Sequence, residues 1–315
     1  MTIEQLSYVL AVARYQSFVQ AATQVAVSQP ALTMQVKKLE DELGLLLFDR
    51  SRKPLLLTEE GRIFLERAQE VLLGFQDLEN LAKELKNREG GDIRLGIIPT
   101  LAPYLVPLFI NHFREAYPKV RLLISELTTE EIIRDIRHGE LDAGIYATPV
   151  QSKGMYHEVL FYERFFLYIS KPHPWYTKQD FYLKDLPEAG LWMLREGNCF
   201  RSQVNDICQL KLHRRPHDQL VYESSSIESL MRIVEHQGGM TLIPELATLA
   251  VSPEQENMLR PFHDSKNVRE ISLAYRQRHH KEKLLKKLKN SILQHIPAHM
   301  CEAENREIVD SFVKA

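Results

Sequence analysis

Cysteine is scarce in this chain of 315 residues, which contains three: Cys199, Cys208 and Cys301. So few cysteines exclude a small secreted scaffold held together by disulfides. No group of histidines and cysteines has the spacing of a zinc site. The pair His279-His280 is more typical of solvated surface, because a structural zinc site needs four ligands. We therefore expect no metal and no cofactor.

Long hydrophobic runs are also missing. The longest apolar stretches, such as residues 45–48 and 165–169, are far shorter than the roughly 20 residues of a membrane-spanning helix. Residues 1–5 contain neither the basic nor the apolar region of a secretion signal. We therefore expect a cytoplasmic protein that does not act in a membrane.

Neither sign of charge is in excess, since 40 basic residues face 42 acidic ones and the formal net charge is -2. This balance argues against bulk electrostatic attraction to nucleic acid, so the positive charge of any DNA-binding surface must be local. A hydrophobic content of 44% and a charged content of 26% are typical of soluble globular proteins. The length predicts two or three domains.

The first 90 residues show mainly helical patterns. Apolar residues recur at helical spacing from Leu6 to Ala13, and Ser17 is a candidate N-cap for a helix over 18–25. Ser28 is a strong N-cap for a third helix that ends near Gly44. Projection of this third helix predicts a core face and an opposite polar, mildly basic face. The core face holds Leu32, Val36 and Leu39, and the opposite face holds Pro30, Thr33, Met34 and Lys37.

A basic turn follows between two short apolar segments. Residues 45–49 and 55–57 predict two short strands, and the turn 50–53 between them predicts a wing. Thr58 and the acidic residues after it are typical of a helix start, and we expect this long helix to run to about Arg88. Residues 89–91 are a candidate hinge.

From Asp92 onward, strand and helix patterns alternate, which predicts βαβ units and a mainly parallel sheet. We expect strands over 93–98, 120–125, 141–147, 165–169, 191–194, 240–243 and 271–275, and one near Val221. We expect helices over 105–117, 130–138, from Cys199, over 227–236 and over 281–296. The lysines of the last helix predict a solvated face, because Leu284, Leu285, Leu288 and Ile292 supply an apolar stripe.

The helix pair at 17–43 can place its second helix in the major groove of DNA. Gln29 and Gln35 are candidates for adenine edges, and Thr33 and Met34 for thymine methyl groups. Lys37, Lys38, Arg50, Arg52 and Lys53 are candidates for phosphate contacts, and Ser28 and Pro30 are further candidates for DNA binding. Periodicity alone leaves an ordinary helical bundle with a solvated face equally open.

Particular residues favour the DNA-binding interpretation. The segments Ala21-Ala22, 27–33, 38–40, 43–44, 47–50 and 57–61 closely resemble the DNA-binding domain of LysR-type regulators. The resemblance implies an α/β protein with a winged helix-turn-helix (1–58), a linker and dimerisation helix with its hinge (59–91), an effector domain (92–300) and a tail (301–315). It also implies that the effector domain is similar to a periplasmic binding protein, with two α/β subdomains around a cleft.

A second motif surrounds Cys199. Asn198 is a good N-cap, so Cys199 falls in the first turn of a helix, where the helix dipole and Arg201 favour the thiolate. If the helix continued to Cys208, the two Cα atoms would lie about 13.5 Å apart along its axis. A disulfide needs less than about 7 Å, so a Cys199–Cys208 bond requires this segment to unwind. Spacing alone favours two buried, inert cysteines.

The segment 193–203 with Cys208, and the segment 96–105, resemble the peroxide-sensing members of the same family. The resemblance implies that Cys199 reacts with peroxide and that Cys208 resolves the product to a disulfide. It implies a peroxide pocket that includes Thr100, Thr129, Asn198, Arg201 and Ser202. Asn198 and Ser202 depart from the family pattern, which commonly has histidine and aspartate there, and asparagine cannot exchange a proton near neutral pH.

The resemblance implies a homodimer or homotetramer whose partners are double-stranded DNA, hydrogen peroxide and RNA polymerase. It implies a regulator of oxidative-stress genes and not an enzyme. Three alternatives remain open at this point: a regulator that senses a small organic effector in the cleft, a thiol peroxidase, and a transport solute-binding protein. Cys301 is interpreted as incidental.

Overall fold

The structure is a computed structural model, and it describes residues 1–86, 90–150, 152, 154–187, 190–209, 222–263, 266–277, 279–302, 306–311 and 313. The chain divides into two compact units, Met1–Lys86 and Asn87–Ala315. The finer boundaries at residues 58, 91 and 300 stay predictions. Arg88, Glu89 and the strand predicted near Val221 lie outside the described residues. Within the described residues, no helix is both long and apolar enough to cross a membrane.

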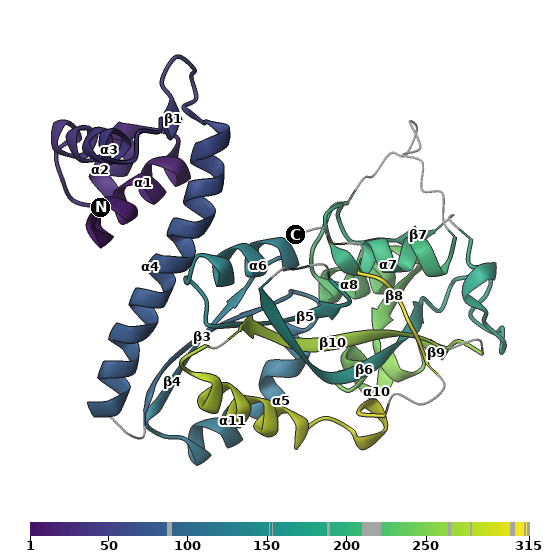
Figure 1. The fold of residues 1–315 in the computed structure, drawn as a ribbon. Helices are drawn as coiled ribbons and strands as arrows, with labels where there is room; N and C mark the ends of the chain where they lie inside the picture. Colours follow the sequence, from purple (N-terminus) through teal and green to yellow (C-terminus); the bar gives the residue numbers. More distant parts are fainter. Residues whose placement is uncertain are drawn as a thin grey trace. The chain divides into compact units, whose positions relative to one another are not determined.

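The N-terminal unit contains the predicted helices and wing (Figure 1). Its elements are α1 (Ile3–Tyr15), α2 (Phe18–Gln24), α3 (Gln29–Leu43), β1 (Phe48–Asp49), β2 (Leu56–Leu57) and α4 (Glu59–Lys86). Ser17 and Ser28 cap α2 and α3 by accepting hydrogen bonds from backbone amides, as predicted. The predicted core face of α3 is confirmed, because Leu32, Val36 and Leu39 are fully buried.

A buried carboxylate and a glycine fix the base of the wing. Glu40 of α3 accepts hydrogen bonds from the Leu47 and Phe48 amides at 2.8 and 3.3 Å, although its side chain is only 4% exposed. A Cβ atom at Gly61 of α4 would lie 2.1 Å from the Leu47 carbonyl oxygen. Larger residues at position 61 are therefore excluded unless the wing shifts.

Among the residues that the structure describes, the effector unit contains a nine-stranded sheet whose main path has the order β4-β3-β5-β10-β6-β8-β7. Its strands are β3 (Gly91–Ile97), β4 (Val120–Glu126), β5 (Ala143–Thr148), β6 (Met155–Ile169), β7 (Leu191–Trp192), β8 (Met240–Pro244), β9 (Leu259–Pro261), β10 (Asn267–Arg276) and β11 (Glu307–Ile308). Its α-helices are α5 (Ala102–Ala116), α6 (Thr129–Arg137), α7 (Cys199–Ile207), α8 (Ile227–Gln237), α9 (Glu245–Thr248), α10 (Pro253–Glu256) and α11 (Glu282–Leu293). The helices α5 and α11 lie side by side (Figure 1).

The expectation of a mainly parallel sheet was wrong at its centre. β3 pairs in parallel with β4 and β5, but β10 runs antiparallel to both β5 and β6. β6 is also much longer than the strand predicted over 165–169. Its first part pairs with β10, and its last five residues pair with β8. β6 therefore joins two halves of the sheet, one around β3 and one around β8.

The chain's last described segment belongs to the sheet. β11 pairs in parallel with the start of β10, and the Val309 amide donates to the Val268 carbonyl at 3.0 Å. Val309 and Ser311 are buried. The segment predicted only as a tail thus completes the core, whereas Cys301 is exposed.

The pair His279-His280 departs from the solvated surface that we predicted. His279 is only 4% exposed, stacks on His280 and lies 3.7 Å from Asp142. Asp142 is itself buried and accepts hydrogen bonds from Arg94 and Lys281. The pair therefore packs beside a buried charge cluster, and no group of potential metal ligands occurs among the described residues.

Candidate functional site

The predicted DNA-contacting residues lie at the N-cap of α3, along its first ten residues and on the wing. The exposed ones are Ser28, Gln29, Pro30, Met34, Lys37, Lys38, Arg50, Arg52 and Lys53. Thr33 and Gln35 are half-buried. An exposed face of this kind, with lysines beside amide and methyl groups, can meet base edges and phosphates together.

Arg50 and Gln35 also contact side chains of other elements inside the unit. The Arg50 guanidinium donates to Glu40 at 2.7 Å and lies 5.2 Å from the centre of the Phe18 ring. Gln35 accepts a hydrogen bond from Gln5 of α1 at 3.4 Å. The sequence analysis missed Glu40 and Gln5, because an acidic residue and an amide in helices carry no local sign of burial.

Cys199 is the first residue of α7 and is buried. Gly197 adopts a φ of +82°, which favours glycine, and turns the chain into the cap. The Asn198 side chain then accepts a hydrogen bond from the Phe200 amide at 2.9 Å, as the N-cap prediction requires. The sequence therefore places the Cys199 thiol at the positive end of a helix dipole.

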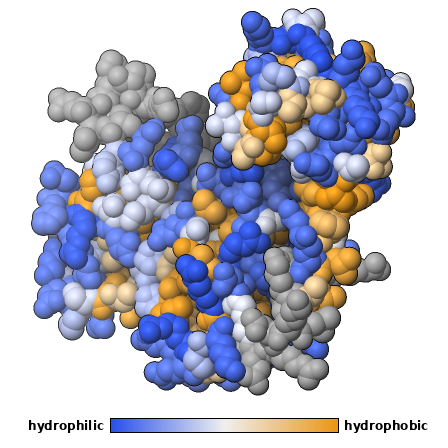
Figure 2. Space-filling model, turned by 90° about the vertical axis from the view of Figure 1, so that its left-hand side faces the viewer, coloured by the Kyte–Doolittle hydropathy of each residue, from blue (hydrophilic) through white to orange (hydrophobic). Residues whose placement is uncertain are grey.

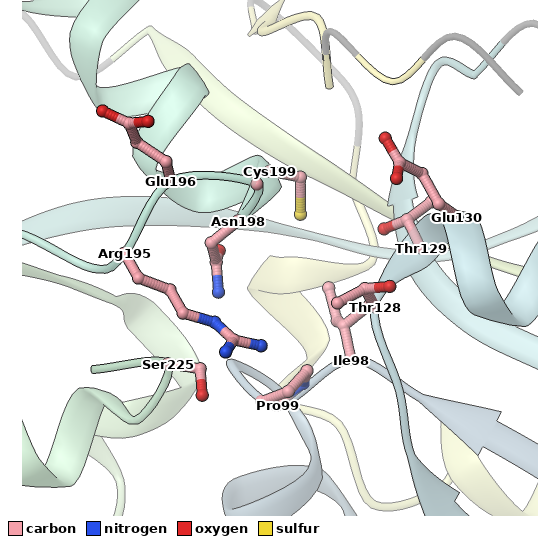
Figure 3. A pocket seen from close by; sticks show the side chains of 11 residues that line it. Ile98, Pro99, Thr128, Thr129, Glu130, Arg195, Glu196, Asn198, Cys199 and Ser225 are labelled. Atoms are coloured by element: carbon pink, nitrogen blue, oxygen red, sulfur yellow. The ribbon is translucent and has the colours of Figure 1, made fainter. Parts of the chain in front are cut away.

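A pocket of about 210 Å³ lies between the two halves of the effector unit, next to this thiol. One wall comes from the ends of β3 and β4 and the start of α6, and the other from the segment before α7. Its lining residues are Ile98, Pro99, Thr128, Thr129, Glu130, Arg195, Glu196, Gly197, Asn198, Cys199 and Ser225. In Figure 3 the Cys199 sulfur points into the space between Asn198 and Thr129.

Of the predicted pocket residues, the structure brings Thr129, Asn198 and Cys199 together on this pocket. The Thr129 hydroxyl is buried and has no hydrogen-bond partner among the described residues. Arg201 instead donates to the Leu194 carbonyl at 2.9 Å and so fixes the turn before α7. Ser202 is not among the lining residues, and its amide donates to the Asn198 carbonyl at 3.3 Å.

Thr100 belongs to a fully buried polar cluster around Arg269. The Arg269 guanidinium donates to Glu163 at 2.8 Å, to Gln203 at 3.0 Å and to Thr100 at 3.2 Å. It also lies 4.9 Å from the centre of the Phe200 ring. Gln203 and Phe200 are both on α7, so this cluster holds the helix that begins at Cys199.

The sequence analysis missed Arg269 and Glu163. Each lies in a strand, and the partners of Arg269 are 66 to 169 residues away along the chain. Burial raises the pKa of the Glu163 carboxyl to about 7, while Arg269 and the Leu246 amide act in the opposite direction. A charged pair without water contact is stable only while its geometry is kept.

Cys208 lies at the other end of α7 and is also buried. The helix is continuous from Cys199 to Ile207, and both cysteines are free thiols. A nine-residue separation in a helix corresponds to about 13.5 Å along the axis. The predicted helix is therefore confirmed, and in this form the two sulfur atoms cannot bond.

The chain matches known protein families over most of its length. Residues 3–62 match the family described as "Bacterial regulatory helix-turn-helix protein, lysR family". Residues 86–297 match the family described as "LysR substrate binding domain". The chain is 31% identical over 300 residues to a "Hydrogen peroxide-inducible genes activator" of Dickeya chrysanthemi. The aligned residues cover 95% of this chain and 97% of the relative.

Two solved structures are similar over nearly the whole chain. A full-length OxyR variant from Pseudomonas aeruginosa is 33% identical, with a TM-score of 0.69 over 96% of this chain and 99% of that one. A hydrogen peroxide-bound OxyR mutant from Corynebacterium glutamicum is 27% identical, with a TM-score of 0.57 over 93% of this chain and 92% of that one.

Proposed function

Because the chain belongs to the LysR family of bacterial transcriptional regulators, which are not enzymes, we propose that it controls transcription in response to hydrogen peroxide, sensed by Cys199. The observation that carries this proposal is the place of Cys199, at a helix N-terminus and directed into a pocket, with a second buried thiol at the other end of the same helix. The relatives that are hydrogen peroxide-inducible activators, and the OxyR mutant with bound hydrogen peroxide, support the choice of peroxide.

The chemistry takes two balanced steps. The Cys199 sulfur attacks one peroxide oxygen, the O–O bond breaks, and Cys199 becomes a sulfenic acid while water leaves. The Cys208 thiol then attacks that sulfur, a disulfide forms, and a second water molecule leaves. Peroxide is reduced and the two thiols are oxidised. Because α7 separates the two sulfur atoms, the second step requires the helix to unwind.

Gln203 links this unwinding to the rest of the effector unit. Its amide oxygen accepts from Arg269 at 3.0 Å, and its amide nitrogen donates to the Val309 carbonyl at 3.4 Å. Loss of α7 would remove both contacts and leave the buried Arg269–Glu163 pair without one partner. We expect the resulting rearrangement to change how subunits pack, and through them the DNA-binding units.

The N-terminal unit supports DNA binding by a homodimer, or by a homotetramer of two such dimers. The side chains of α4 include exposed apolar residues at helical spacing, among them Val71, Phe75 and Leu78, which favour pairing with a second copy. Apolar patches stand out on the otherwise largely hydrophilic face shown in Figure 2. Operator DNA would meet the exposed face of α3 and the wing, and contact with RNA polymerase would follow for an activator.

The test compares operator footprints of the reduced and peroxide-treated chain at one fixed salt concentration. We expect the footprint to change in the native chain and to stay unchanged in Cys199→Ser. Cys301→Ser serves as the matched control, because this exposed thiol lies outside the pocket, and it should respond like the native chain. A Cys199→Ser variant that still responds to an inducer would instead favour an organic effector in the pocket.

A further inference from the structure

The pocket beside Cys199 is larger and more positive on one side than hydrogen peroxide alone requires. Its volume of about 210 Å³ compares with the roughly 10–15 Å³ that a cavity needs to hold one water molecule, and hydrogen peroxide has only two oxygen atoms. The starts of α6 and α7 both line it, so two helix N-termini present amide groups to its space.

Arg195 adds a full positive charge to this wall. Its guanidinium makes no hydrogen bond or ion pair with any other residue that the structure describes, and in Figure 3 it lies near Asn198, Pro99 and Ser225. Its backbone is fixed, because the Arg195 amide donates to the Ser224 carbonyl at 2.7 Å. An arginine held by its backbone, with a free guanidinium at a pocket wall, can take a carboxylate in two parallel hydrogen bonds.

The acidic residues of the pocket do not neutralise Arg195 directly. Glu130 and Glu196 also line the pocket, and Figure 3 shows the Glu196 carboxylate directed away from Cys199. Hydrogen bonds from Thr128 lower the pKa of the Glu131 carboxyl most, and the positive charge of Arg195 lowers it less. The Thr128 amide and hydroxyl hold this carboxylate at 2.8 and 2.9 Å. The guanidinium is therefore available to a ligand.

Thr129 supplies the second polar contact. Its hydroxyl is buried and unpartnered, and in Figure 3 it points toward Cys199 from the opposite wall. A buried hydroxyl without a partner is unfavourable, and a ligand atom between Thr129 and the sulfur would give it one. The pocket thus offers a hydroxyl at the reacting end and a guanidinium at the other side.

We propose that this pocket selects organic hydroperoxides that carry a carboxylate, with Arg195 as the specificity-determining residue. The inference rests on the proposed peroxide-sensing function and names its substrate class. The Cys199 sulfur takes one oxygen of R–OOH, the O–O bond breaks, and the products are the Cys199 sulfenic acid and the alcohol R–OH. The thiol proton passes to the leaving oxygen, so no further reductant is needed.

The test measures single-turnover loss of the Cys199 thiol in the full chain by mass spectrometry. Three oxidants are compared: hydrogen peroxide, cumene hydroperoxide and ring-carboxylated cumene hydroperoxide. We expect the carboxylated compound to react at least tenfold faster than its neutral counterpart at low salt, and the ratio to fall as salt rises. Arg195→Gln should bring the ratio near one, and Arg195→Lys should keep part of it.

The control is Arg232→Gln, which removes an exposed arginine of α8 that pairs with Glu235 and lies outside the pocket lining; its ratio should equal that of the native chain. Equal rates for the two organic hydroperoxides in the native chain, with normal hydrogen peroxide reactivity, would overturn the substrate class and leave the sensor function standing. A thiol that reacts with none of the three oxidants would overturn both. Binding of non-reactive 4-isopropylbenzoate to Cys199→Ser, lost on adding Arg195→Gln, gives an independent second readout.

Discussion

Two buried charge clusters stabilise the effector unit, and they differ in what they hold. Asp142 ties β5 to β3 and to the start of α11 through Arg94 and Lys281. Arg269 ties β10 to β6 and to the redox helix α7 through Glu163 and Gln203. The first cluster joins elements for which we propose no change of structure. The second includes a helix that must unwind if the two cysteines bond. A buried charge can therefore either hold a fold in one state, as Asp142 does, or make contacts that are lost when the structure changes, as Arg269 does.

The largest expected effect comes from breaking the Arg269 cluster. Arg269→Met leaves the Glu163 carboxylate buried without its partner, and we expect the free energy of unfolding of the reduced chain to fall by about 3–5 kcal/mol. Chemical denaturation of the full chain measures this change. The double variant Arg269→Met with Glu163→Gln should recover part of the loss, because no unpaired charge remains. A loss below about 1 kcal/mol for the single variant would show that the pair does not hold the fold.

The two clusters should also respond to pH in opposite directions. Hydrogen bonds from Arg94 and attraction to Lys281 outweigh burial and lower the pKa of Asp142 to about 2. Its contribution is therefore present above pH about 4 and lost as pH falls toward 2. For Glu163, whose pKa is raised by burial, stability falls as pH rises from about 4.5 through 7.

Unfolding measured from pH 2 to pH 8 separates these two slopes. Asp142→Asn should lower the free energy of unfolding by on the order of 2 kcal/mol at neutral pH. It should also remove the fall in stability below about pH 4, with the pH dependence between 4.5 and 7 unchanged. Glu163→Gln should remove the fall in the free energy of unfolding between pH 4.5 and 7. If both substitutions removed the pH dependence over the same range, the contrast between the two clusters would be wrong.

A smaller effect should distinguish the clusters by oxidation state. Gln203→Met leaves the buried Arg269 without one acceptor, and we expect it to destabilise the reduced chain by about 1–2 kcal/mol. In the oxidised chain we expect almost no cost, since unwinding has already removed the contact. Lys281→Met is the matched control, because its cost should be the same in both oxidation states. Equal costs for Gln203→Met in both states would argue against unwinding.

The sequence predicted the parts of the fold that depend on neighbouring residues. Ser28 and Asn198 each begin a helix where the local pattern placed them, and Leu32, Val36 and Leu39 occupy the predicted core face. Cys199 was placed at a helix start from Asn198 alone. These features follow from capping and periodicity, which act within a few residues.

The missed parts depend on residues far apart in the chain. Thr100 meets Arg269 across 169 positions, and no local pattern marks either as buried. Arg195 precedes Cys199 by only four residues, yet its place in the pocket depends on α6 and β3 from the other half of the sheet. The sequence predicted shorter strands for β6 and β10 and a mainly parallel sheet. It could not predict that these two strands pair antiparallel, because hydrophobic periodicity gives no strand direction.

On the proposed function, oxidation joins Cys199 to Cys208 by unwinding α7, and one experiment tests this directly. The purified full chain is titrated with hydrogen peroxide, the disulfide is mapped by mass spectrometry, and backbone amide exchange is followed over residues 199–208 in the same samples. We predict a Cys199–Cys208 bond at or below equimolar peroxide, together with loss of exchange protection across α7. Thiols that stay free, or a helix that keeps its protection after oxidation, would contradict the account.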